Sequence, residues 1–219
     1  FGQTLTGRSI GELLTERWPN TIKLALMAIT VVIIVGISAG VVAGIRRGSI
    51  FDNTTLLVTL VVIGIPVFVL GYILQYALAL KWHIFLPTGN DGTIYSLVLP
   101  ALVLAMLSMA TALRLTRTSV AENLRSDYVR TARAKGLPNR RVVGVHVLRN
   151  SLIPVVTYLG ITVGDLMSGA IVTESIFNIP GVGFSVAQGV RTEDGPLVVG
   201  IVSLLVIVYL TCNLLVDVL

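Results

Sequence analysis

The chain has 219 residues, of which 54% are hydrophobic and only 12% are charged. Together with a mean hydropathy of +0.90, this composition excludes an ordinary soluble domain and indicates a protein that lies mostly within a membrane. The formal net charge is +5, and the single cysteine rules out an intrachain disulfide.

Residues 1–20 are predicted to form an amphipathic segment on the outer side of the membrane. At helical spacing its apolar and charged side chains fall on two sides, with Ile10, Leu13, Leu14 and Trp18 on the first and Arg8, Glu12, Glu16 and Arg17 on the second. The segment does not have the pattern of a signal peptide. Because Phe1 is not a natural start, we expect the full protein to have one more span before it.

Five apolar runs with almost no charges follow, each about long enough to cross a hydrocarbon core of ~30 Å. We expect membrane-spanning helices at residues 21–45, 54–80, 94–116, 151–173 and 197–219. Five such helices in one soluble core would leave almost no residues to cover them. The expected fold class is all-α, a polytopic transmembrane helical bundle with five spans in this chain and six in the full protein.

Several spans contain small residues at helical spacing, and the second span also contains a helix-breaking proline. Gly36, Gly40 and Gly44 repeat at helical spacing in the first span, which predicts close packing against another helix. Gly64 and Pro66 lie in the second span, and proline removes a backbone donor there. A bend is therefore expected at Pro66, either as a static kink or as a hinge.

The orientation follows from Lys and Arg, because short loops rich in these residues stay in the cytoplasm. Arg46 and Arg47 follow the first span, and residues 114–149 hold nine basic residues against two acidic ones. The connections at 81–93 and 174–196 hold one basic residue each. The first span is therefore predicted to run from outside to inside, with the C-terminus in the cytoplasm.

The basic loop at residues 117–150 is predicted to contain two short helices. Residues 120–135 are good helix formers, Gly136 is placed to end that helix, and Pro138 is placed to begin the next. The loop would then form a compact cytoplasmic protrusion. Basic residues beside a membrane often bind anionic lipid heads, but attraction to lipid does not require a defined turn.

Residues suited to catalysis or metal binding are sparse. Asp165 is the only charge well inside a span, so it is predicted either to line a translocation path or to form an interhelical hydrogen bond. His83 and His146 have no partners at metal-ligand spacing. The sequence also contains no phosphate-binding loop, zinc-protease motif or nucleophile elbow. The chain is therefore not expected to be an enzyme, and any ATP would be bound by another subunit.

Two longer motifs point to a family. Residues 127–137 read D-Y-V-R-T-A-R-A-K-G-L, followed by H-V-L-R-N at 146–150, and residues 174–183 read E-S-I-F-N-I-P-G-V-G. In these segments and across essentially its whole length, the chain resembles permease subunits of bacterial ATP-binding cassette (ABC) importers of the dipeptide, oligopeptide and nickel group. The resemblance implies an ABC type I importer permease fold in the bacterial cytoplasmic membrane.

The loop departs from the pattern of the wider family, which is E-A-A, three residues, Gly and then I-x-L-P. Counting back from Gly136, this chain has R-T-A at residues 130–132, and it has H-V-L-R at residues 146–149. This departure argues against the sugar-type subfamilies and for the peptide and nickel group.

The resemblance implies that the basic loop is a coupling loop, which docks on an ATPase subunit and transmits its closure to the spans. The residues expected to take part are Arg130, Ala132, Arg133, Lys135, Gly136, Leu137, Pro138, Arg140 and Arg141. For each arginine, a solvated or lipid-facing charge is the alternative.

Residues 174–183 resemble the external loop that precedes the last span in this family. The residues expected to contact the binding protein or to gate the cavity are Glu174, Phe177, Pro180, Gly181 and Gly183. For Pro180 and Gly181, a passive turn is the alternative.

The resemblance also implies partners: a second homologous permease, two ATP-binding ATPase subunits, an extracytoplasmic substrate-binding protein and membrane lipid, but no nucleic acid. This chain is expected to bind no cofactor and no metal, with ATP and Mg held by the partner subunits. The expected function is ATP-driven import of dipeptides or oligopeptides. Import of nickel, glutathione or haem is the alternative within the family. A secondary transporter is the alternative outside it, although more ionisable residues would then be expected within the spans.

Overall fold

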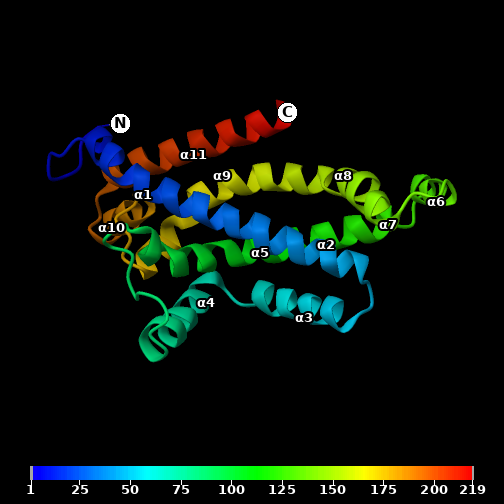
Figure 1. Cartoon of the computed structure of the whole chain (residues 1–219). Helices are drawn as coiled ribbons and strands as arrows, with labels where there is room; N and C mark the ends of the chain where they lie inside the picture. The colour runs from blue at the N-terminus through cyan, green and yellow to red at the C-terminus, as the bar shows by residue number, and fades with distance from the viewer. Residues whose placement is uncertain (1, 219) are drawn as a thin grey trace. The chain divides into compact units, whose positions relative to one another are not determined.

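The computed structural model describes residues 2–218, and the side chains of all of these except residues 167–169, 216 and 217. The described chain consists of helices joined by short connections (Figure 1). Within these residues, β structure is limited to one isolated bridge between Gln3 and Ser9. The predicted all-α class is confirmed.

Among the described residues, three helices are long and apolar enough to cross a membrane. The first covers Ile10–Ile45 and consists of α1 (Ile10–Val31), a π-helical stretch (Val32–Ile37) and α2 (Ser38–Ile45). The others are α5 (Ile94–Asn123) and α11 (Gly195–Val218). Helices suit this role because their backbone groups are hydrogen-bonded within the segment.

Two further crossings are obtained when bent helix pairs are each counted as one span. The first pair consists of α3 (Ile50–Gly64) and α4 (Val67–Leu74), which continues as the π-helical stretch Gln75–Lys81. The second consists of α7 (Asn139–Arg141), the π-helical stretch Val142–Val147 and α8 (Leu148–Ser151), followed by α9 (Ile153–Ile176). On this count the described residues contain five spans, the predicted number. The second pair, however, includes residues 139–150, which were predicted to belong to the cytoplasmic loop.

The second predicted span is interrupted at Pro66. Helix α3 ends at Gly64, and Pro66 has extended backbone angles, with φ −56° and ψ 139°. Proline has no N–H to donate and disfavours the helical conformation in the residue before it. The bend expected from Gly64 and Pro66 is therefore a complete break in the helix. A hinge motion there stays a prediction.

The chain divides into two compact units. Unit 1 comprises the described residues of Phe1–Val31, Ile65–Met106 and Gly160–Leu219. Unit 2 comprises Val32–Gly64 and Leu107–Leu159, and it contains the basic loop.

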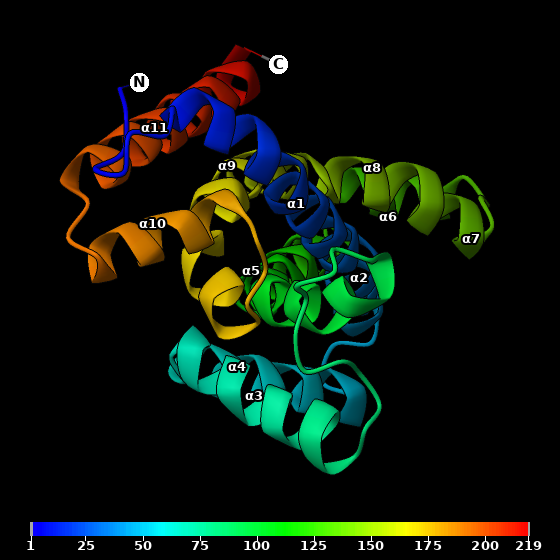
Figure 2. The same cartoon turned by 90° about the vertical axis from the view of Figure 1, so that its left-hand side faces the viewer.

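One apolar cluster in unit 1 joins three helices: α1, α10 (Val182–Arg191) and α11. Its buried residues are Ile10, Leu13, Leu14, Val182, Val186, Leu197, Ile201 and Leu205, with Trp18 packed against them. Helix α10 lies beside α11 (Figure 2). The predicted apolar side of residues 1–20 is thus the side that is buried. The helix crosses residue 20 without a break, so no structural boundary separates this segment from the first span.

In unit 2, the first span packs against α5 along its glycine repeat. A Cβ atom on Gly36 would lie 3.1 Å from the carbonyl oxygen of Met109, and one on Gly40 would lie 2.7 Å from that of Leu113. One on Gly44 would lie 2.8 Å from the carbonyl oxygen of Arg117. At these three positions the absence of a side chain lets the first span approach the backbone of α5, which confirms the predicted close packing.

We expect the substitution Gly44→Ala to lower the free energy of unfolding of unit 2 by about 1–3 kcal/mol, because the new methyl group would overpack the contact with α5. Thermal unfolding of the purified protein in detergent measures this loss. The matched control is Gly144→Ala, since no described atom lies within 4 Å of a Cβ at Gly144. Equal stability of the two variants would contradict the packing argument.

Candidate functional site

The basic loop of unit 2 begins after Asn123, which is later than predicted. Its first part is not one continuous helix. Helix α5 extends to Asn123, a turn follows, and α6 covers Asp127–Ala134. The prediction of one helix over residues 120–135 is therefore wrong. Ser126 has extended backbone angles, and its hydroxyl donates a 2.6 Å hydrogen bond to the carbonyl oxygen of Asn123. Serine competes well for such backbone bonds, which favours a helix boundary here.

The end of α6 has the hydrogen bonds of a Schellman motif. Gly136 has a φ of +75°, its N–H donates to the carbonyl oxygen of Arg133, and the N–H of Leu137 donates to that of Ala132. A positive φ is the usual reason for glycine at this position. Pro138 then precedes α7, and its carbonyl oxygen accepts hydrogen bonds from the N–H groups of the first turn. The turn predicted from Gly136 and Pro138 is confirmed.

A small apolar cluster holds the loop against the end of α5. Its buried members are Val120 of α5, Val129 and Ala132 of α6, and Val142 and Val147 of the following π-helical stretch. Val41, Leu124, Leu137 and Leu148 pack around it. Ala132 and Leu137, two of the predicted site residues, therefore contact the loop's own core. The loop is therefore a packed element of unit 2.

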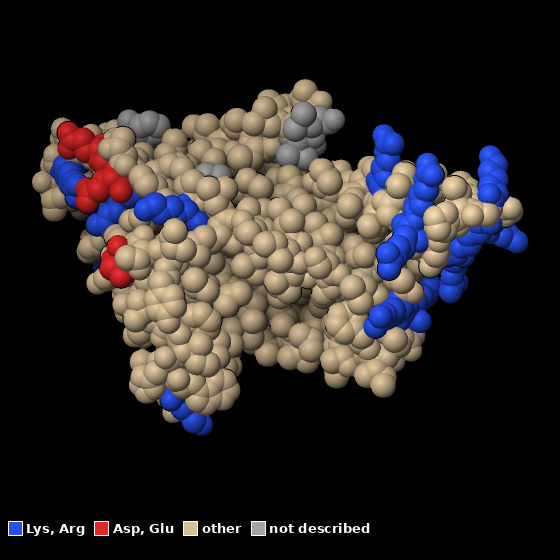
Figure 3. All heavy atoms as spheres, in the orientation of Figure 1, with Lys and Arg blue, Asp and Glu red and all other residues tan. Residues whose placement is uncertain are grey.

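The charged members of the predicted site point outward. The exposed cations are Arg130, Arg133, Lys135, Arg140 and Arg141, and Figure 3 shows Lys and Arg gathered over this end of unit 2. Arg130 contacts Asp127 at 3.5 Å, but both side chains are more than three quarters exposed, so the pair adds little stability. These five cations, which we call the docking cations, are accessible to an acidic partner or to lipid.

One charge of the basic stretch has an internal partner that the sequence did not indicate. Arg117 donates from Nε to Oδ1 of Asp52 at 2.9 Å, and from Nη2 to Oδ2 at 2.7 Å. The Asp52 side chain is 1% exposed. Ser49 and Asp52 have the spacing of a capping box at the start of α3, so a search for helix caps would have located Asp52. It would not have identified Arg117.

In unit 1, the predicted site residue Glu174 is buried near the end of α9. Its Oε1 accepts a 2.7 Å hydrogen bond from the hydroxyl of Thr21, and its Oε2 accepts a 2.8 Å bond from the N–H of Phe184. The Thr21 hydroxyl oxygen in turn accepts from the N–H of Val182 at 2.9 Å. Glu174 and Thr21 thus satisfy N–H groups in the first turn of α10, where Gly181 has no side chain to do so.

The other predicted residues of this segment surround Glu174. A Cβ on Gly181 would overlap the Glu174 carboxyl group, and one on Gly183 would lie 2.6 Å from the Cα of Ile171. Phe177 is fully buried, and the carbonyl oxygen of Pro180 accepts a hydrogen bond from Asn20. The predicted external loop is therefore tightly packed, and Thr21 of α1 is a partner of it that the sequence did not indicate.

Comparisons with known proteins indicate the same family as the two motif segments. The family model for the binding-protein-dependent transport system inner membrane component matches residues 33–219. The chain belongs to this family. The dipeptide transport system permease protein DppB of Escherichia coli is 37% identical to it, over 96% of this chain and 71% of the relative.

Two further relatives have similar identity and coverage. The di/tripeptide transport system permease protein DppB of Pseudomonas aeruginosa is 37% identical, over 96% of this chain and 74% of the relative. The dipeptide transport system permease protein DppB of Bacillus subtilis is 34% identical, over 95% and 68%. The resemblance to ABC importer permeases of the dipeptide and oligopeptide group is confirmed. The permease is a multi-pass membrane protein of a transport system.

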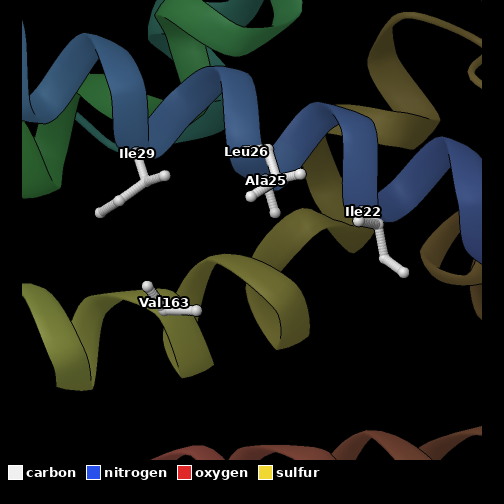
Figure 4. Close-up of a pocket in the computed structure, with 5 residues that line it drawn as sticks. All are labelled: Ile22, Ala25, Leu26, Ile29 and Val163. Atoms are coloured by element: carbon white, nitrogen blue, oxygen red, sulfur yellow. The ribbon is translucent and has the colours of Figure 1, made fainter.

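Two of the hollows described in unit 1 are lined mostly by apolar side chains. The cavity between α1 and α9, of about 40 Å³, is lined only by Ile22, Ala25, Leu26, Ile29 and Val163 (Figure 4). Asp165 is exposed and lines a larger hollow of about 310 Å³ with aliphatic residues and Tyr209. Its role as a path contact or an interhelical partner stays a prediction. Within the described residues, no group of three or more His, Cys, Asp or Glu side chains is placed to hold a metal ion.

We expect Thr21→Val to lower the free energy of unfolding of the permease by about 1–3 kcal/mol, because it leaves the N–H of Val182 and the Glu174 carboxyl group short of a partner. Thr21→Ser keeps the hydroxyl group and should remain closer to the original stability. Thermal unfolding of the two variants tests the difference. If valine is tolerated as well as serine, the hydroxyl does not hold α10 in place.

Proposed function

We propose that this permease is the membrane subunit of an ATP-driven peptide importer, and that its basic loop couples it to separate ATPase subunits. The observation that carries the proposal is the construction of the loop: an apolar inner side that packs on α5, and an outer side that bears the docking cations. Relatives named as dipeptide and di/tripeptide permeases cover almost the whole chain, including this loop.

The loop's structure is suited to transmitting force. A flexible loop would absorb the movement of a partner, whereas a helix that is capped at Gly136 and packed on Val120 moves together with α5. In the proposed cycle, ATP binding closes the ATPase subunits, the loop moves with them, and the cavity opens toward an extracytoplasmic binding protein. Hydrolysis then resets the permease. A second homologous permease and two ATPase subunits complete the proposed complex.

Peptide is the proposed substrate because the relatives' names include dipeptides and tripeptides. Nickel complexes, glutathione and haem remain alternatives of the same transport class. The segment around Glu174 is proposed to face the binding protein or to gate the cavity. Its support is the packing of α10 against both α1 and α11, which would let a contact at α10 act on two spans.

We expect Gly136→Val to abolish peptide-stimulated ATP hydrolysis by the reconstituted importer while the permease still inserts in the membrane. No described atom lies within 4 Å of a Cβ at Gly136, so the obstacle is the φ of +75° and not space. A non-glycine residue in this conformation costs about 1–2 kcal/mol. Asparagine tolerates the conformation better, so Gly136→Asn is the matched control. Normal transport by the valine variant would overturn the coupling assignment.

We expect the double substitution Arg140→Glu and Arg141→Glu to weaken binding of the ATPase subunits, because it places negative charge opposite an acidic partner. The weakening should shrink at high salt, where exposed charges are screened. Binding of the purified ATPase subunits to the permease in nanodiscs measures both effects, and Arg114→Glu, an exposed charge before the loop, is the control.

The same nanodiscs, prepared with and without anionic lipid, test the lipid alternative for these arginines. A defect that appears only with anionic lipid, with ATPase binding unchanged, would assign Arg140 and Arg141 to the membrane surface and not to the ATPase.

A further inference from the structure

The ion pair between Asp52 and Arg117 is the most deeply buried one described in the chain. The Asp52 and Arg117 side chains are 1% and 17% exposed, against 47% or more for both partners of the other two pairs. Two parallel hydrogen bonds join the guanidinium group to the carboxylate. This fork geometry fixes both the distance and the orientation between the two groups.

The same carboxylate also holds the turn between α2 and α3. Oδ2 of Asp52 accepts a 2.8 Å hydrogen bond from the N–H of Gly48, which has a φ of +82°. The N–H of Asp52 donates to the hydroxyl oxygen of Ser49 at 3.2 Å. Asp52 therefore joins three elements of unit 2: the turn after α2, the first turn of α3, and α5.

The ion pair lies next to the packed base of the basic loop. Arg117 and Val120 are about one helical turn apart on α5, and Gly44 of α2 packs against both of them. Val120 also belongs to the buried apolar cluster that includes Val129 and Ala132 of α6. A continuous series of contacts thus leads from α6 through Val120 to Arg117, and from there through the ion pair to α3.

Stability alone is a poor reason for an ion pair at this position. The cost of removing two charges from water offsets much of their attraction, and a well-packed apolar pair of similar volume is often at least as stable. What an apolar pair lacks is the fixed distance and angle that two parallel hydrogen bonds impose. The forked ion pair holds α5 and α3 in a single register.

We propose that Asp52 and Arg117 are positioning residues for transport: the pair transmits displacement of the basic loop and α5 to α3. This inference rests on the proposed function, since it requires that the loop docks on an ATPase subunit. Neither residue contacts the docking partner in this scheme. Both act through the helices that they join.

The test uses the complete reconstituted importer and measures peptide uptake and ATP hydrolysis in the same vesicles. Arg117→Lys keeps the charge but removes the fork, and the double substitution Asp52→Leu with Arg117→Met replaces the pair by apolar side chains. Arg114→Lys, on an exposed residue one turn earlier on α5, is the matched control. Peptide imported per ATP hydrolysed is the decisive quantity, because a purely structural role would change the amount of active complex and not this ratio.

We expect both Arg117 variants to hydrolyse ATP while the ratio of uptake to hydrolysis falls about tenfold, within the range of coupling between distant sites. Arg114→Lys should leave the ratio unchanged. If the apolar pair or Arg117→Lys retains the original ratio, the ion pair serves packing only and the inference is wrong. Arg117→Lys decides the question even where the apolar pair fails to assemble. If the unsubstituted complex imports no peptide, the proposed function itself fails, and the inference fails with it.

Discussion

The structure depends on one constraint: backbone N–H and C=O groups that leave water must find partners within the protein. Long helices meet it along most of the chain, so the informative places are those where a helix stops. At the end of α6, Gly136 allows the chain to turn back and use its own carbonyl groups. At the start of α10, Glu174 and Thr21 supply acceptors from two other helices. Each interruption is stabilised by a specific, identifiable residue.

The second organising feature is close approach of helices without bulky side chains. In a membrane, apolar side chains gain little by leaving lipid, so helices associate through contact area and through polar groups. Unit 2 has a close backbone contact and a polar contact within a few residues of each other. Gly44 packs on the backbone of α5 at Arg117, and the side chain of the same arginine binds Asp52. The result is a rigid base beneath the basic loop.

The loop joins this base to a surface suited to a partner. Its apolar residues are used inside the permease, whereas the docking cations remain exposed. This division separates two roles that the motif alone presents together: Ala132 and Leu137 hold the loop in shape, and the cations are available for recognition. In unit 1, the side chains of Glu174 and Phe177 are likewise buried within the permease.

The sequence by itself determined the features that follow from local pattern: the apolar spans, a bend at Pro66, the close-packing glycines and the turn at Gly136. These depend on hydropathy over about 20 residues or on the conformational limits of one residue. The boundary between α5 and α6 was missed because Ser126, whose hydroxyl donates to the carbonyl oxygen of Asn123, interrupts a run of good helix formers. Only the tertiary structure decided that Glu174 pairs with Thr21 and Asp52 with Arg117. These partners are 153 and 65 residues apart, and no local propensity encodes which distant side chain will share a buried charge.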